Sequence, residues 1–358
     1  MKILISSDGM HAHFYQRISW LRAFMGCGIQ THLWDTTKVS AFDAFDSVQP
    51  DIFLGQLYNL TPSVIKCIKE RPGLQVGLRA GDRGDHRDPI DLSSFNVLFS
   101  SDEELEKLIE LKKQTGQPEF VHIHYHEDDI KNTHSYFNSI GIPPVSLMMC
   151  ADVHAYSDFP SLKNDPPPTP ALQCDIGFVG GYWPYKGQVI DRYLTPLCHP
   201  VGKYNIKIFG NQPWRHVNQY CGTISDENVK NVFRSAKISP NLSEPHALEY
   251  GIDVNERIFK VLCSGGFCIS DSMRAYRKVF EQGVVFAEDP EDFRNKIDHY
   301  KDDAEARKLI ASVGRSHVLK NHTNFHRVAS ILEHFGHKPE AEKIRSDWVA
   351  FLAKEGIK

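Results

Sequence analysis

The chain has 358 residues, 41% hydrophobic and 24% charged, with a formal net charge of −4 at pH 7. This composition is typical of a folded protein with a sizeable core and enough length for two domains. The mildly acidic balance argues against bulk binding of nucleic acid through phosphate attraction, and no apolar run approaches the ~20 residues that span a membrane.

The first half of the chain alternates short apolar runs with segments of helical period. We expect strands at residues 3–5, 29–35, 50–56, 74–82, 96–101, 120–126 and 146–152. Helices are expected between them at residues 14–28, 61–73 and 102–116. Strands that alternate with helices predict an α/β domain with a doubly wound, Rossmann-like parallel sheet, placed at residues 1–156.

Polar residues that follow these strands are candidates for chemistry, because function gathers at the carboxyl ends of parallel strands. Asp8, His11 and His13 crowd the loop after the first strand, where a histidine can act as a general base near neutral pH. We predict these three as catalytic residues. The remaining polar residues at such positions are interpreted as solvated loop residues: Gln56, Arg79, Asp82, Arg83, His124, His126 and Asp152.

Residues 157–173 contain five prolines and almost no periodicity, which predicts an interdomain linker. The alternation then restarts, so we expect a second Rossmann-like domain at residues 174–335. Its strands are expected at residues 174–179, 205–209, 237–243, 265–271 and 283–287. A C-terminal helix within residues 336–358 is expected to pack back on the first domain.

Gly180 and Gly181 follow the first strand of the second domain, and glycines there let a ligand approach backbone N–H groups. The pattern differs from the GxGxxG of nicotinamide-binding domains and from the GxxxxGK[ST] of P-loop proteins. His122, His124 and His126 alternate along one strand, which fits packing better than a small metal site. We therefore predict no metal site and no cofactor.

The most informative stretch of the chain is residues 239–271. A helix is expected to begin after Asn255 as the N-cap, with Glu256 in its first turn, and to end at the glycine pair that starts at Gly265. The N-terminus of a helix gathers unpaired N–H groups and partial positive charge, so it stabilises an anion such as phosphate. Arg257 and Lys260 can add full charges there. The alternative is an ordinary αβ unit in which both cations are solvated.

Several motifs of the second half resemble the C-terminal half of CgeB-like glycosyltransferases, which are similar in turn to the broader GT-B glycosyltransferases. The specific motif is NERIFKVLCSGGFCISD at residues 255–271. Supporting segments are FVGGYWPYKGQ, IKIFGNQPW, KISPNLS, GVVFAEDPEDF and NHTNFHRV, so the resemblance covers roughly residues 174–332. It implies two Rossmann-like domains that face each other across a cleft. A nucleotide-sugar would be held mainly by the second domain, and an acceptor mainly by the first.

The resemblance also implies roles for individual residues. Gly180, Gly181 and Lys186 would line the donor diphosphate. Arg257 and Lys260 would neutralise this diphosphate together with the helix N-terminus. The other residues implied at or near the donor are Phe209, Gly210, Asn211, Asn241, Ser243, Glu244, Asn255 and Glu256.

The chain departs from the family pattern at one position. In many retaining relatives two glutamates stand seven residues apart, and the second position corresponds to Lys260 here. Glu249 and Glu256 lie out of register with that pair, so the ribose-binding acid cannot be carried over. The stereochemical outcome, retaining or inverting, therefore stays open. In an inverting enzyme one of the three predicted catalytic residues would deprotonate the acceptor; in a retaining enzyme they would position substrates.

We therefore expect a hexosyl- or pentosyltransferase that moves a sugar from a nucleotide-diphosphate sugar to a hydroxyl of a glycan, protein or other acceptor, without a metal ion. Two alternatives share the architecture: a non-catalytic nucleotide- or sugar-binding protein, and a nucleotide-sugar epimerase, which needs no acceptor. A transferase acting on modified bases in DNA has little support from the charge balance. The eight cysteines, interpreted as free thiols, and the lack of a signal peptide predict a cytoplasmic location.

Overall fold

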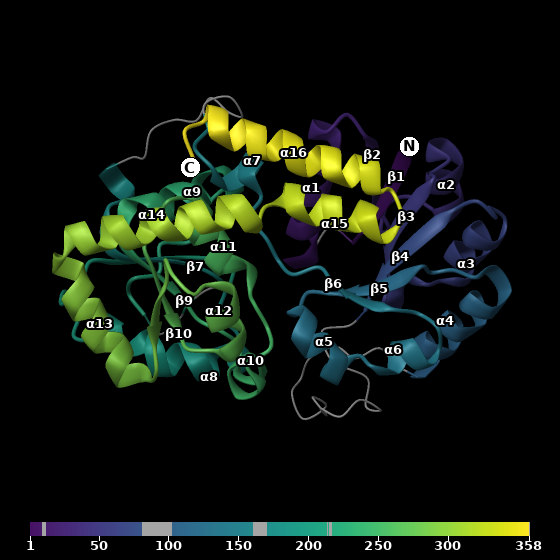
Figure 1. Cartoon of the computed structure of the whole chain (residues 1–358). Coiled ribbons are helices and arrows are strands. Elements are labelled where there is room, and N and C mark those ends of the chain that lie inside the picture. The colour runs from purple at the N-terminus through teal and green to yellow at the C-terminus, as the bar shows by residue number, and fades with distance from the viewer. Residues whose placement is uncertain (9–11, 81–101, 160–169, 213, 215–216, 358) are drawn as a thin grey trace. The chain divides into compact units, whose positions relative to one another are not determined.

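The computed structural model describes residues 1–8, 12–80, 102–159, 170–212, 214 and 217–357, with only the backbone described at residues 12, 13, 102 and 131–133. Contacts divide the chain into two compact units (Figure 1). Unit 1 comprises Met1–Met148 and Asn324–Ala350, and unit 2 comprises Met149–Thr323 and Phe351–Lys358. Each unit contains one parallel sheet with helices, so the predicted α/β class is confirmed.

Unit 1 is built on a six-stranded parallel sheet with the strand order β2-β1-β3-β4-β5-β6. The strands are β1 (Lys2–Ser7), β2 (Gln30–Asp35), β3 (Ile52–Gln56), β4 (Gln75–Arg79), β5 (Phe120–Ile123) and β6 (Pro144–Ser146). The helices between them are α1 (Ala12–Gly26), α2 (Ala41–Val48), η1 (Leu57–Asn59), α3 (Pro62–Lys69), α4 (Asp102–Thr115), α5 (Glu127–Thr133) and α6 (Tyr136–Ser139). Central strands such as β3 are buried along their whole length, as continuous apolar runs in parallel sheets predict.

One late helix and most of another belong to unit 1 rather than to the second half of the chain. In α15 (Asn324–His334), Val328 and Leu332 join the core formed by Trp20 and Phe24 of α1. In α16 (Lys338–Lys354), Ile344 is part of the same core. Figure 1 shows both helices in yellow beside α1. The division thus differs from the expected boundaries after residues 156 and 335, because apolar side chains of α15 are buried against the first sheet.

Unit 2 is built on a five-stranded parallel sheet with the order β11-β10-β9-β7-β8. The strands are β7 (Cys174–Val179), β8 (Ile206–Phe209), β9 (Ala236–Asn241), β10 (Cys268–Asp271) and β11 (Val285–Ala287). The helices are α7 (Val153–Tyr156), η2 (Pro170–Leu172), α8 (Pro184–Tyr193), η3 (Thr195–Cys198), α9 (Asp226–Ser235), α10 (Pro245–Tyr250), α11 (Glu256–Cys263), α12 (Arg274–Val279), α13 (Pro290–Asp302) and α14 (Ala304–Asn321).

Two expected strands of unit 1 differ from the structure, and one lies outside the described residues. The strand predicted at residues 146–152 is wrong, because β6 ends at Ser146 and Asp152 caps α7. The strand predicted at residues 120–126 ends early, because His126 is the N-cap of α5. The strand predicted at residues 96–101 and the linker residues 160–169 lie outside the described part of the chain.

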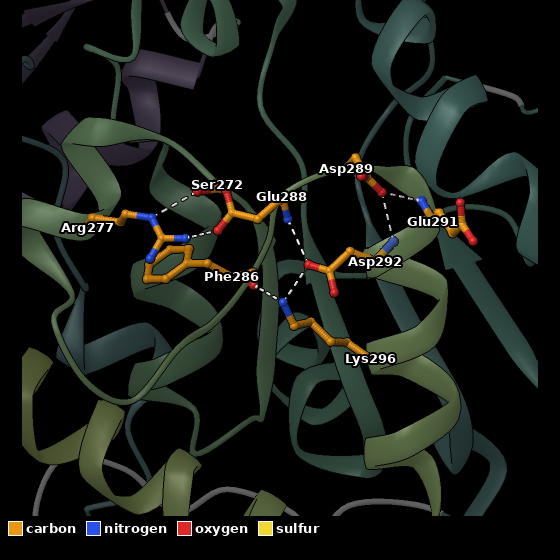
Figure 2. A network of polar contacts seen from close by, with 8 residues as sticks. All are labelled: Ser272, Arg277, Phe286, Glu288, Asp289, Glu291, Asp292 and Lys296. Atoms are coloured by element: carbon orange, nitrogen blue, oxygen red, sulfur yellow. Dashed lines mark hydrogen bonds and ion pairs between the residues drawn. The ribbon is translucent and has the colours of Figure 1, made fainter.

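The carboxyl end of β11 shows how local chemistry begins a helix in unit 2. Asp289, the N-cap of α13, accepts hydrogen bonds of 2.8 Å from the backbone N–H groups of Glu291 and Asp292 (Figure 2). Pro290 occupies the first helical position, where its missing N–H is not needed. The Asp292 carboxylate in turn pairs with Lys296 at 2.5 Å. Helix α13 therefore begins directly after the turn at Asp289.

Candidate functional site

The ends of β7, β8 and β9 and the start of α11 meet at the carboxyl edge of the unit 2 sheet. The N–H of Gly180 donates to the carbonyl oxygen of Phe209 at 2.8 Å, which joins the two loops that follow β7 and β8. A Cβ atom on Gly180 would lie 2.9 Å from Nη2 of Arg257, and one on Gly181 would lie 3.1 Å from Oδ1 of Asn211. These glycines therefore permit a close approach that other residues would block.

Arg257 reaches this edge from the first turn of α11. Its Nε donates to the carbonyl oxygen of Val179 at 3.1 Å, and its Nη1 donates to that of Leu242 at 3.2 Å. The guanidinium carbon lies 4.5 Å from the centre of the Phe178 ring. Burial lowers the pKa of Arg257 from its usual value, and nearby acidic groups oppose this shift. Two backbone carbonyls thus fix the guanidinium while Nη2 faces Gly180.

Lys186 supplies a second cation from the first turn of α8. Its side chain is 8% exposed, and Nζ lies 4.9 Å from the centre of the Trp183 ring. Burial, reinforced by the charge of Arg257, lowers the pKa of Lys186 to about 7, although Glu244 and Asp253 act in the opposite direction. Among the described residues, no carboxylate lies within ion-pair distance of Lys186 or Arg257.

The arrangement suits an anion with several oxygen atoms. Two nearby cations that have no carboxylate partner among the described residues repel each other, and an anion placed between them relieves this repulsion. The N-terminus of α11 adds a partial positive charge, because Asn255 occupies the N-cap position without a side-chain capping hydrogen bond. Asn255 instead donates from Nδ2 to the carbonyl oxygen of Leu242, while its Oδ1 is buried without a hydrogen-bond partner in the described structure.

Lys260 and Glu256, also predicted at the donor, form an ion pair with each other. Lys260 Nζ lies 2.6 Å from Glu256 Oε2, and the two side chains are 14% and 17% exposed. The Lys260 ammonium also lies 5.3 Å from the centre of the Tyr156 ring. Although burial lowers it, Glu256 and Tyr156 raise the pKa of Lys260 above its usual value. The structure therefore does not bring Lys260 into the set formed by Lys186 and Arg257.

A network of buried polar side chains lies at the same edge of the sheet, at the ends of β9 and β10. Asp271 accepts hydrogen bonds from the Ser243 N–H at 2.6 Å and from Ser243 Oγ at 2.9 Å. Ser243 Oγ also lies 3.0 Å from the Tyr276 hydroxyl. Asn241 donates from Nδ2 to Ser270 Oγ at 2.9 Å, while its Oδ1 has no hydrogen-bond partner in the described structure. The predicted residues Asn241 and Ser243 thus lie together.

Sequence reasoning missed Asp271 and Tyr276 as members of this network. It also missed the contact between Tyr185 and His246. The Tyr185 hydroxyl lies 2.9 Å from His246 Nδ1, and the two rings are stacked. An available signal for Asp271 was an acid as the last residue of a buried strand. Tyr185 and His246 are 61 positions apart in sequence, so no local pattern could have paired them. The predicted residue Glu244 is the N-cap of α10, beside His246.

The predicted catalytic residues of unit 1 are only partly described. Asp8 directly follows β1, and its Oδ2 accepts a hydrogen bond of 3.0 Å from the Tyr58 hydroxyl. His11 lies outside the described residues, and only the backbone of His13 is described, within α1. Their roles therefore stay predictions. Within the described ranges, no group of three or more His, Cys, Asp or Glu side chains could hold a metal ion, and no helix is long and apolar enough to cross a membrane.

Known proteins resemble this chain in sequence over part of its length and in fold over most of it. Residues 192–333 match the family model described as Glycosyl transferase-like; most of this segment lies in unit 2, and its last residues, from Asn324, lie in unit 1. Among curated proteins no match to the chain is found.

Three solved structures illustrate the likeness in fold. HepE from Anabaena, in complex with UDP, has a TM-score of 0.57 and 11% identity, covering 94% of this chain and 99% of that chain. A glycosyltransferase from Rickettsia africae has a TM-score of 0.55 and 13% identity, covering 96% and 98%. Sucrose-phosphate synthase from Thermosynechococcus elongatus has a TM-score of 0.59 and 10% identity, covering 94% and 98%. The predicted GT-B fold of two Rossmann-like domains is therefore confirmed.

Proposed function

We propose that the protein is a glycosyltransferase that moves a sugar from a nucleotide-diphosphate sugar to an acceptor hydroxyl. The observation that carries this proposal is the pair formed by Lys186 and Arg257 beside the backbone of Gly180 and Gly181. Within the described part of the chain, neither cation has a carboxylate partner. The match of residues 192–333 to a glycosyltransferase-like model and the GT-B fold support it. Within that class, the motif at residues 255–271 favours the CgeB-like branch.

In the proposed reaction, the bond between the anomeric carbon and the diphosphate oxygen breaks as the acceptor oxygen bonds to that carbon. The diphosphate leaves with the bonding electrons and gains negative charge. Lys186, Arg257 and the N-terminus of α11 stabilise this charge before and during departure, a role that metal ions have in other transferases. We therefore propose a metal-independent reaction, with hexosyl or pentosyl donors.

The other parts of the reaction are assigned by position. Asn241, Ser243 and Glu244 lie at the end of β9 and would contact the sugar or nucleoside, and Asn211 would lie near the base. In unit 1, Asp8 would accept the acceptor proton in an inverting reaction, with the Tyr58 hydroxyl orienting its carboxylate. Because HepE was solved with UDP, uridine diphosphate sugars are the first donors to test. We propose a cytoplasmic location.

The experiment is donor-dependent release of nucleoside diphosphate from UDP-glucose and other nucleotide sugars, with a mixed panel of hydroxyl acceptors. We expect release by the wild type and by Arg192→Met, an exposed cation of α8. Arg257→Met should lower the rate by roughly 100-fold, since charge-assisted hydrogen bonds contribute about 1.5–3 kcal/mol each. Equal rates in Arg257→Met and the wild type would contradict the assignment of the diphosphate site.

A second candidate function is a non-catalytic nucleotide-sugar-binding protein. The observation that favours it is that Lys260 stands where retaining relatives are expected to have a carboxylate at the donor. Lys260 instead forms an ion pair with Glu256. Tight binding of nucleotide sugars, without release of nucleoside diphosphate from any donor and acceptor combination, would support this function over transfer.

A further inference from the structure

A second group of charged and polar side chains lies in unit 1, at the carboxyl edge of its sheet. Gln56 and Arg79 are the last residues of the neighbouring strands β3 and β4, and His124 follows β5 directly. Arg17 joins them from α1, the helix that follows β1. These side chains are 1%, 4%, 6% and 0% exposed, respectively, so Gln56, Arg79 and His124 are buried rather than solvated as the sequence suggested.

Arg17 is the central member of this group. Its Nη2 donates to the carbonyl oxygen of Gly55 at 3.1 Å, and its guanidinium carbon lies 5.0 Å from the Trp20 ring centre. Nε and Nη1 are buried without hydrogen-bond partners in the part of the chain that the structure describes. A buried guanidinium with two nitrogen atoms that donate to no acceptor is unfavourable unless an acceptor becomes available.

A second guanidinium lies close to Arg17. Arg79 Nη2 donates to His124 Nδ1 at 3.4 Å. Burial, followed by the charge of Arg79, lowers the pKa of Arg17 to about 9, while Tyr58 and Asp8 act in the opposite direction. The charge of Arg79 thus acts on Arg17 in a buried region where water screens little, and the charge of Asp8 opposes this effect.

Further polar atoms beside Arg17 also lack partners. Both side-chain polar atoms of Gln16 and Oε1 of Gln56 are buried without a hydrogen bond in the described structure, and Gln16 is 3% exposed. Such atoms are rare in proteins, and a bound molecule or ion commonly explains them. The group reaches the surface at Tyr58, whose side chain is 40% exposed and donates to Asp8.

We infer that the group formed by Arg17, Arg79 and His124 is a binding site for an oxyanion, the phosphate or carboxylate of an acidic acceptor. Arginine suits this role because its planar fork matches a phosphate or carboxylate with two hydrogen bonds. The assignment of the anion to an acceptor rests on the proposed function. With the acidic group held there, an acceptor hydroxyl would be directed towards Asp8, one residue beyond β1 at the same edge.

The first test measures anion binding without a donor, in full-length protein that carries Arg257→Met so that the donor site does not compete. Thermal unfolding is followed with inorganic phosphate and with glucuronate, at constant ionic strength. We expect at least one of these anions to raise the Tm of the single variant Arg257→Met. The same increase is expected in the double variant that carries Arg257→Met and Arg22→Met. Arg22 is the matched control, because it is an exposed arginine of the same helix. The increase in Tm should be lost in the double variant that carries Arg257→Met and Arg17→Met.

An equal increase in Tm with Arg17→Met, or no increase with either anion in Arg257→Met, would overturn the proposed site. If Arg17→Met abolishes cooperative unfolding, Arg79→Met replaces it under the same criteria. The response to phosphate against glucuronate distinguishes the two sources of the oxyanion.

The second test concerns the acceptor and keeps this inference separate from the proposed function. Among acceptors that support release of nucleoside diphosphate, acidic ones should be preferred over their neutral counterparts, and Arg17→Met should raise their KM by about tenfold without changing the KM of the donor. A preference for neutral acceptors would overturn the assignment to an acceptor. Anion binding in a protein that releases no nucleoside diphosphate would instead overturn glycosyl transfer and leave the anion site in place.

Discussion

Lys260 and Glu256 lie one turn apart on α11, with Nζ and Oε2 2.6 Å from each other. Removing only the cation would leave a largely buried carboxylate without its partner, which commonly destabilises a protein by several kcal/mol. We expect Lys260→Met to lower the free energy of unfolding by on the order of 3 kcal/mol, measured by urea denaturation, with part of the loss recovered in Lys260→Met with Glu256→Gln.

The same variant separates a structural role of Lys260 from donor binding. Because Lys260 is engaged by Glu256, its removal should change the affinity for UDP-glucose by less than about threefold, within the range of indirect effects. A tenfold loss of affinity at unchanged stability would show that Lys260 contacts the diphosphate after all.

Gly180 controls the position of the Arg257 guanidinium. A Cβ at this position would lie 2.9 Å from Arg257 Nη2, and Arg257 cannot move away without breaking its hydrogen bonds to Val179 and Leu242. Gly180→Ala should therefore lower the affinity for UDP by roughly tenfold, the effect of one charge-assisted hydrogen bond, as measured by calorimetry. Gly73→Ala is the control, since a Cβ there meets no atom within 4 Å; equal affinities in the two variants would contradict the prediction.

Lys186 predicts a pH dependence of donor binding. Burial lowers its pKa to about 7, so the ammonium form that attracts the diphosphate is lost as the pH rises above 7. The dissociation constant for UDP-glucose should rise by up to about tenfold per pH unit above 7. Lys186→Arg keeps its charge and should bind with a flat profile between pH 6 and 9. A dissociation constant of the wild type that does not change with pH would contradict the assignment of Lys186 to the diphosphate site.

In the protein without ligand, the lowered pKa of Lys186 makes the free energy of unfolding rise with pH, whereas donor binding weakens. Between pH 7 and the usual lysine value of 10.5, the unfolded chain binds more protons at this position than the native state. The contribution of Lys186 to the free energy of unfolding therefore rises with pH across this window. Unfolding of Lys186→Met should lack this increase, and an unchanged difference between the two proteins from pH 7 to 10 would refute it.

Asp271 predicts a second pH effect at lower pH. Burial raises its pKa from 3.8 to about 6, against the hydrogen bonds from Ser243 and Ser270. The native state thus binds more protons than the unfolded chain over this window, and the contribution of Asp271 to stability is lost as the pH rises through 6. Relative to Asp271→Asn, the wild type should lose on the order of 3 kcal/mol of unfolding free energy between pH 3.5 and 7, measured by urea unfolding at each pH.

The local elements of the candidate site could be read from short stretches of sequence. The start of α11 after Asn255, its end before Gly265 and the buried strand that ends at Asp271 follow from capping residues, glycine and apolar period. The ion pair between Glu256 and Lys260 was also accessible, because a spacing of four residues in a helix predicts it. The helix-terminus argument and the motif resemblance both placed Lys260 at a phosphate instead.

Other features depend on contacts between residues far apart in the chain. The pairing of Asp271 with Ser243 requires β9 and β10 to be neighbours, and the placement of α15 in unit 1 requires its apolar face to meet α1. The burial of Gln56, Arg79 and His124 was misjudged for the same reason. A polar residue after a strand is exposed or buried according to what packs over it, which no local pattern specifies.

The amino-acid sequence by itself thus determined the α/β class, the two-domain architecture and the identity of the glycines and cations at the end of β7 and the start of α11, because period, capping and turn chemistry act over a few residues. Only the tertiary structure decided which cations have no carboxylate partner among the described residues, Lys186 and Arg257, and which one is paired, Lys260. That outcome depends on side-chain burial and on distances of a few ångströms across elements, over which electrostatic energy changes steeply.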